Sequence, residues 1–235
     1  MGNFFKTCAL FLLACCMGYT GQAQENSYSQ SVKPLFQSTD ARIHPGESLV
    51  PAICHSSTHS ADTTLGLSPF GREVVREMNL SGILVDVSHC SSGTFWDCIN
   101  YSKAPIICSH SGAKAVFPHD RNLTDDQLRA LSQKGGLVMV YIVPDYMRAD
   151  KKDATLDDMM EHLMHCIRVA GIDHVGISCD FDGGGGGWGL NGDNDAINVT
   201  VRLMEAGYTD EEIGKIWSGN FFRVLKAAQD YAGRL

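Results

Sequence analysis

The stretch Ile83-Leu-Val-Asp-Val-Ser-His89 decides the fold class of this sequence. It is a short apolar run suited to one buried strand, and it ends on a titratable side chain. Three later segments repeat the pattern after intervening helical stretches: Pro105–His110, Leu137–Val143 and His174–Asp180. Strands that are buried on both faces and alternate with helices predict a parallel α/β sheet.

The helices between these strands begin at recognisable caps. Ser68 followed by Pro69 predicts a helix start, and Thr124 is the expected cap of a later helix. Residues 155–170 form a long amphipathic pattern. A complete eight-stranded barrel typically needs ~250 residues. We therefore expect a partial (β/α) TIM-type barrel of about four parallel strands with alternating helices.

Composition and charge limit the classes of protein that remain. The chain has 235 residues, of which 44% are hydrophobic and 20% are charged, enough for one sizeable core. This balance excludes disordered, collagen-like and coiled-coil proteins. The net charge is −8, and the sequence contains no block of five like charges. We therefore expect no nucleic-acid partner.

The N-terminus has the features of an export signal. Lys6 precedes an apolar run from Cys8 to Met17, which is too short to span a bilayer. Small residues follow at Gly21-Gln-Ala23, so we interpret residues 1–23 as a secretory signal peptide. A lipobox with Cys15 as its lipid-bearing residue is the alternative. Both interpretations predict an exported protein, in the bacterial periplasm or anchored to the membrane as a lipoprotein.

Beyond the signal, residues 24–65 are polar and poorly periodic, and we expect them to be poorly ordered or divergent. The partial barrel is expected over residues 66–235. Cysteines at 90, 108 and 179 lie at or near predicted strand ends rather than in short Cys-rich loops. We therefore expect buried free thiols rather than a disulfide framework.

His89 and His110 each follow a serine and each end an apolar strand. The carboxyl ends of parallel strands meet at one edge, where α/β barrels carry their chemistry. Two neutral imidazoles at that edge can share a divalent cation, with zinc the preferred candidate. Taken singly, each could instead be a hydrogen-bonded histidine at a strand end. The repeated Ser-His pattern favours a metal site.

Asp180 ends the fourth predicted strand. A carboxylate there can take a proton from a metal-bound water and return it to a leaving amine. Asp182 is a close competitor, and an Asx-turn residue before the glycine loop is the alternative role. The run Gly183 to Gly187 lacks the phosphate-loop pattern, so we interpret it as a flexible active-site loop.

Arg121 lies in the loop that follows the His110 strand. A guanidinium group there can clamp a substrate carboxylate through two parallel hydrogen bonds. The alternative is an exposed arginine that caps or pairs with Asp125 or Asp126.

From Gly66 to about Leu225 the chain resembles the membrane-dipeptidase (renal-type dipeptidase) family of zinc-dependent hydrolases on an α/β barrel. The matching stretches, in family order and at family spacing, are Gly66–Asn79 (GLSPFGREVVREMN), Leu84–His89 (LVDVSH), Lys103–Ser111 (KAPIICSHS), Arg121–Asp125 (RNLTD), Gly171–Gly176 (GIDHVG) and Asp180–Gly183 (DFDG).

The resemblance implies a role for each candidate residue. His89 and His110 resemble the two histidines that hold the second zinc of the family. Arg121 is similar to the arginine that binds the C-terminal carboxylate of the dipeptide substrate. Asp180 resembles the residue that exchanges a proton with the attacking hydroxide. His55 resembles the substrate-polarising histidine, although its segment also fits a later family stretch without such a histidine.

Some family features have no counterpart in this sequence. The family supplies a His-x-Asp pair to the first zinc and a glutamate that bridges both metals, and residues 24–66 contain neither. Of the five metal ligands of the family, this sequence keeps two, His89 and His110. We therefore expect at most one zinc, weakly held, and impaired dipeptide hydrolysis. The alternatives are a non-catalytic binding protein and half of a split enzyme. The open barrel edge would then be covered by residues 24–66, a homodimer partner or another protein.

Overall fold

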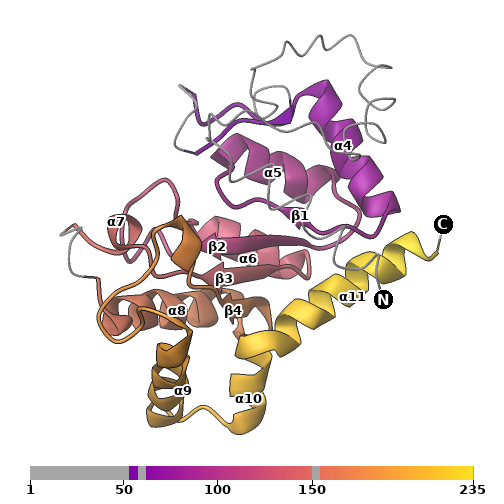
Figure 1. The fold of residues 1–235 in the computed structure, drawn as a ribbon. Helices are drawn as coiled ribbons and strands as arrows, with labels where there is room; N and C mark the ends of the chain where they lie inside the picture. The colour runs from indigo at the N-terminus through magenta and orange to yellow at the C-terminus, as the bar shows by residue number, and fades with distance from the viewer. Residues whose placement is uncertain (1–52, 58–61, 150–153, 235) are drawn as a thin grey trace, which may run out of the picture.

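The computed structural model describes residues 53–57, 62–149 and 154–234 (Figure 1). The predicted signal peptide lies outside these residues, as does most of the segment 24–65. Four strands form one parallel sheet in the order β1-β2-β3-β4. Their bounds are β1 Val85–Asp86, β2 Ile106–Ser111, β3 Leu137–Val140 and β4 Val175–Ile177. The prediction of about four parallel strands alternating with helices is confirmed.

Helices follow each strand and cover the sheet. The α-helices are α4 (Pro69–Leu80), α5 (Ser92–Tyr101), α6 (Asp125–Gln133), α7 (Pro144–Met147), α8 (Leu156–Ala170), α9 (Ala196–Glu205), α10 (Asp210–Gly214) and α11 (Asn220–Ala232). The shorter turns are η1 (Ile172–His174), η2 (Phe181–Gly183), η3 (Asp193–Asp195) and the π-helical η4 (Lys215–Gly219). In the described residues no helix has both the length and the apolar character needed to cross a membrane.

Hydrogen bonds confirm the two predicted caps, Ser68 and Thr124, and show a further cap at Thr155. The Ser68 hydroxyl accepts from the N–H of Gly71 at 2.9 Å, and Pro69 is the first residue of α4. Thr124 and Thr155 each form a complete capping box at the start of α6 and α8. Such bonds satisfy main-chain donors that a helix leaves unpaired at its first turn.

The two faces of the sheet pack against different elements. The main core lies between the sheet and its crossover helices, whereas Ile107 and Leu137 form a separate cluster with Val224 of α11. Arg223 of α11 donates hydrogen bonds to the carbonyls of Gly135 and Asp173, just before β3 and β4. Figure 1 shows α11 beside the amino ends of the strands, while α7 lies at the opposite edge. The carboxyl edge is therefore left for the candidate site.

Strand β4 is an edge strand, and the C-terminal region of the chain covers part of it. The buried Asn220 side chain donates to the carbonyls of Ile172 and Val175 at 2.7 and 2.8 Å. These bonds satisfy backbone acceptors that an open edge would leave unpaired. Our expectation that cover must come from residues 24–66 or from a partner is therefore wrong for this part of the edge.

Strand β1 is shorter than the predicted Ile83–His89. The Asp86 carboxylate accepts from the N–H of Ser88 at 2.9 Å and turns the chain out of the strand. His89 consequently lies in a turn, with a left-handed backbone at φ 64°. The six cysteines of the described region are free, as expected: Cys54, Cys90, Cys98, Cys108, Cys166 and Cys179.

Candidate active site

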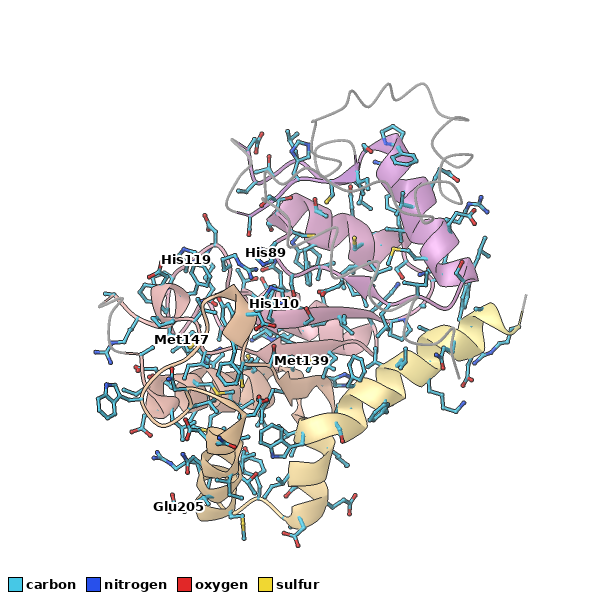
Figure 2. All side chains as sticks on the ribbon, in the orientation of Figure 1. His89, His110, His119, Met139, Met147 and Glu205 are labelled. Carbon is cyan, nitrogen blue, oxygen red and sulfur yellow. The ribbon has the colours of Figure 1, made fainter. Side chains whose placement is uncertain are left out.

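The imidazoles of His89 and His110 lie side by side at the carboxyl edge of the sheet. Their ring centroids are 4.8 Å apart, with an angle of 61° between the ring planes. Figure 2 shows both side chains where the β1 turn meets the end of β2. The structure thus brings together the two predicted metal ligands, although one of them comes from a turn rather than a strand.

A chain of hydrogen bonds orients the His110 ring. The Ser109 hydroxyl lies 2.8 Å from His110 Nδ1 and donates to Asp86 Oδ2 at 2.5 Å. The Ser109 N–H also donates to Asp86 Oδ1 at 3.1 Å. Because the serine proton is directed to the carboxylate, its oxygen is available to accept Nδ1–H. That tautomer leaves the Nε2 lone pair for a ligand.

His110 Nε2 is buried and has no hydrogen-bond partner within the described part of the chain. Burial lowers the pKa of His110, and the positive charge of Arg121 lowers it further, against smaller opposing effects of Asp180 and Asp86. The ring is therefore held in its neutral form, which is the form that ligates metal. A buried polar atom without a partner is typical of a position where an ion or ligand binds.

Arg121 is buried, with a relative exposure of 3%. Its guanidinium carbon lies 5.8 Å from the ring centre of Tyr141 and 5.5 Å from that of Tyr146. Atoms Nε and Nη2 are buried and find no hydrogen-bond partner among the described residues. The Arg121 main chain is fixed by a bond from its N–H to His119 Nδ1 and by one from the Ser111 hydroxyl to its carbonyl. These contacts present an unpaired cation that suits a carboxylate.

The alternative of an exposed Arg121 paired with a helix carboxylate is wrong. Asp125 pairs with His165 and Arg129, and Asp126 pairs with Arg129. Both carboxylates therefore pair with residues of α6 and α8, whereas the Arg121 side chain is buried.

Two supporting residues escaped the sequence analysis. The Tyr141 hydroxyl donates to Asn122 Oδ1 at 2.8 Å, and the Asn122 amide donates to the carbonyls of Phe117 and Tyr146. Burial raises the pKa of Tyr141 well above its usual value, so the phenol stays protonated as a donor. A polar-tipped residue inside the apolar run Leu137–Val143 was the available signal.

Asp180 follows β4 on the same edge of the sheet. It has a left-handed backbone, φ 58°, and its charge acts on both His110 and Tyr141. Asp180 is half-buried, whereas Asp182 is exposed, which favours Asp180 as the residue that faces the site.

The glycine loop is bonded closely to Asp180. The N–H groups of Gly183 and Gly185 both donate to the Asp180 carbonyl, at 2.9 and 2.8 Å. A Cβ atom at Gly183 would overlap the Asp180 carboxylate, and one at Gly185 would overlap the Cys179 carbonyl. The glycines are thus needed for close approach around the candidate acid/base.

His55 is half-buried. Its N–H donates to the Thr94 hydroxyl at 3.1 Å, and its carbonyl accepts from the N–H of Ser91 at 2.8 Å. Its imidazole acts electrostatically on the exposed Asp62. The main chain of His55 is therefore anchored beside the His89 turn, while its ring interacts with Asp62, which is not one of the candidate site residues.

A cavity of about 80 Å³ adjoins the site. Its lining includes His89 and Arg121 together with the polar side chains of Asn122 and Gln127. The second cation on its wall, Lys114, is paired with Asp120 at 2.7 Å. Arg121 is thus the cation with unpaired donors on this cavity wall.

The fit to a metal ion is partial. His89 and His110 offer two imidazoles, but no group of three His, Cys, Asp or Glu side chains with metal-binding geometry occurs in residues 53–57, 62–149 and 154–234. Catalytic zinc normally takes three protein ligands and a water. The described residues therefore supply a metal-binding pair rather than a complete ligand set.

Comparisons with known proteins give the class of this fold and site. A model of the membrane dipeptidase family (peptidase family M19) matches residues 50–235. Dipeptidase tcpJ of Claviceps purpurea is 38% identical over 178 residues, which cover 75% of this chain and 42% of that protein. A dipeptidase of Schizosaccharomyces pombe, C965.12, is 40% identical over 167 residues, which cover 70% of this chain and 40% of that protein.

Solved structures agree with these matches. The probable dipeptidase PvdM from Pseudomonas aeruginosa superposes with a TM-score of 0.68 and 27% identity, over 71% of this chain and 56% of that one. A metallopeptidase from Rhodobacter sphaeroides, liganded with a phosphinate mimic of the dipeptide L-Ala-D-Ala, gives a TM-score of 0.66 and 31% identity. The match covers 69% of this chain and 47% of that one.

The fold and these matches agree on one protein family. The chain belongs to the membrane dipeptidase family. It spans about two fifths of the length of the curated relatives that it matches, 42% and 40%.

Proposed function

We propose that this chain carries the second-zinc and carboxylate-binding part of a dipeptidase site, and that alone it hydrolyses dipeptides only feebly. The observation that supports this most directly is the pair of buried, unpaired groups at one edge of the sheet: His110 Nε2, beside the ring of His89, and the guanidinium of Arg121.

Each side chain has a distinct task in this proposal. A bound zinc would supply an activated water and polarise the scissile carbonyl. Arg121 binds the C-terminal carboxylate of the dipeptide and fixes its orientation. Asp180 accepts a proton from the attacking water and donates it to the departing amine nitrogen. His55 hydrogen-bonds to the substrate.

The proposal expects weak activity because two neutral imidazoles hold zinc less firmly than three ligands that include a carboxylate. At most one zinc is then held per chain.

The test is a calorimetric zinc titration of the chelator-treated full chain, together with turnover of L-Ala-D-Ala at saturating zinc. We expect at most one weakly held zinc, little turnover, and loss of zinc binding in His110→Gln. His165→Gln, at a surface histidine paired with Asp125, is the matched control and should bind as the parent does. Two tightly held zincs with rapid turnover would refute the impairment, and unchanged zinc binding in His110→Gln would refute the site.

A second candidate function is binding to a partner that completes the barrel. It is favoured by the incomplete ligand set and by β1, a two-residue edge strand beside the site. The partner would supply metal ligands and pair with β1, and could be a second copy of this chain. Solution mass with and without zinc tests it, because a monomer under both conditions contradicts self-association.

Export through residues 1–23, with or without a lipid on Cys15, is part of the proposal. Mass spectrometry of the mature N-terminus tests it. An intact Met1 in protein recovered from cells would contradict cleavage.

A further inference from the structure

Residues 53–57 lie against the turn that carries His89. An antiparallel bridge pairs Ser56 with Cys90, and the N–H of Ser57 donates to the His89 carbonyl at 2.7 Å. The turn at the candidate metal site is thus held from outside the sheet by a very short ladder.

Two thiols meet across this ladder. Cys54 precedes Ser56 by two residues, so in extended chain the two side chains share a face, the face that meets Cys90. The Cys54 and Cys90 side chains are hydrogen-bonded to each other. Both residues are free thiols and only partly buried, so a small oxidant can reach them.

We propose that Cys54 and Cys90 form a reversible disulfide that fastens residues 53–57 to the His89 turn. The bond requires the two sulfurs to approach to about 2.05 Å, and the short ladder already places the two cysteines next to each other. The main-chain groups of Ile53 and His55 on either side of Cys54 are hydrogen-bonded, so the side chains rather than the backbone make the approach.

A low-molecular-weight disulfide, such as oxidised glutathione, is the oxidant in this step. The Cys54 thiolate attacks one sulfur of the oxidant, which forms a mixed disulfide and releases one thiolate. Cys90 then loses its proton and attacks the Cys54 sulfur, which expels the second thiolate. Two electrons pass to the oxidant, and the released thiolates take up the two protons lost by the cysteines.

The other described cysteines are poor competitors. Cys98, Cys108 and Cys166 are buried, and burial raises the pKa of Cys108 and of Cys179 to about 11. The hydrogen bond from Cys90 instead lowers the pKa of Cys54, which favours the attacking thiolate.

Oxidation would change the stability of the chain in a measurable way. The bond closes a loop of about 36 residues that contains α4 and β1, and such a closure restricts the unfolded chain. For a protein of this size we expect the melting temperature to rise by about 10 °C.

The test uses the full chain in a buffer with chelator, equilibrated with oxidised glutathione or with dithiothreitol, then alkylated and mapped by mass spectrometry. Trypsin leaves Cys90 and Cys98 on one peptide, because no Lys or Arg lies between Arg76 and Lys103. Chymotryptic cleavage after Phe95 or Trp96 separates them. We expect a Cys54–Cys90 cross-linked peptide, 2 Da lighter than its reduced halves, only in the oxidised sample.

Cys54→Ser and Cys90→Ser should each abolish both the cross-link and the shift in melting temperature. Cys179→Ser is the matched control and should keep both. The proposal is overturned if Cys54 and Cys90 remain alkylatable after oxidation, if either pairs mainly with another cysteine, or if both redox states melt together. None of these measurements involves zinc or a dipeptide, so the outcome is independent of the proposed catalytic function.

Discussion

The Ser109 hydroxyl lies between the carboxylate of Asp86 and the ring of His110, and it decides which nitrogen of that ring is free. This chain of bonds ends on Nδ1 of His110, whereas Nε2 is the nitrogen left for a metal ion. The effect of Asp86 and Ser109 on a bound metal ion is therefore indirect, through the orientation and tautomer of one ligand.

Ser109→Ala removes this hydrogen-bonding link and leaves both histidine side chains in place. We expect the zinc affinity to fall by about tenfold, because outer partners of a metal ligand typically contribute that much. Zinc titration of the parent and the variant measures the change. Ser132→Ala is a matched control, since its hydroxyl bonds only to a carbonyl of its own helix. Equal affinities of the Ser109 variant and the parent would show that the relay does not orient His110.

His162 is one residue that makes folding stability depend on pH. Its side chain has no exposed surface, its Nδ1 accepts from the N–H of Ala113, and burial lowers its pKa from 6.5 to about 4. The unfolded chain therefore takes up a proton near pH 6.5, while the folded chain stays neutral. Stability is unaffected above pH 6.5 and falls as the pH drops from there towards 4.

Over that interval we expect the wild-type chain to lose about 3 kcal/mol of unfolding free energy through this residue. His162→Gln removes the titration, so its denaturation midpoint should depend less on pH between 6.5 and 4.5. Urea titrations at several pH values give the two slopes. Parallel slopes for the parent and the variant would contradict the assignment.

At the scale of single elements, the start of α8 shows how local the helix signals are. Thr155 accepts from the N–H of Asp158, whose carboxylate accepts in return from the N–H of Thr155 at 2.7 Å. Thr155→Ala should lower the unfolding free energy by about 1 kcal/mol, because it leaves a first-turn donor without its acceptor. Denaturant titration measures the loss. Thr155→Ser keeps the hydroxyl and should recover most of it, and a failure to do so would point to packing rather than capping.

The same locality explains what the sequence could and could not predict. Capping residues such as Ser68, Thr124 and Thr155 act on donors two or three residues away, so their pattern is visible in the chain itself. The length of β1 was predicted wrongly because Asp86 captures a neighbouring N–H and ends the strand, a choice that an apolar run does not reveal.

The candidate site, too, could be predicted only in part from the sequence. The edge that gathers His89, His110 and Asp180 followed from strand order, because parallel strands place their carboxyl ends together. The burial of Arg121 and its contact with the Tyr141 ring could not be predicted in this way, because they depend on contacts between segments distant in sequence. The polar side chain of Tyr141 was the one local sign.

For the molecule as a whole, α11 connects the end of the chain to the middle of the sheet. Val224 is fully buried against Ile107 and Leu137, near the amino ends of β2 and β3. The opposite edge of the same strands carries the candidate site. The packing of α11 and the candidate site thus lie at opposite ends of the same strands.

Val224→Ala should lower the unfolding free energy by about 2 kcal/mol, from the lost burial and the cavity that remains. If the described region unfolds as one unit, tryptophan fluorescence and far-ultraviolet circular dichroism shift together to the same lower midpoint. Phe222→Ala, on the same helix but 62% exposed, should change stability by less than about 0.5 kcal/mol. A separate early transition in Val224→Ala would show that α11 melts alone.

His89 and Asp180 share an uncommon property, since they are the two non-glycine residues of the described chain with a positive φ. Glycine is the residue that adopts this conformation at least cost. A redesign that optimised folding alone would therefore put glycine at both positions and erase an imidazole and a carboxylate of the site. If the proposed roles are right, these two side chains are kept for the chemistry of the site at some cost in stability.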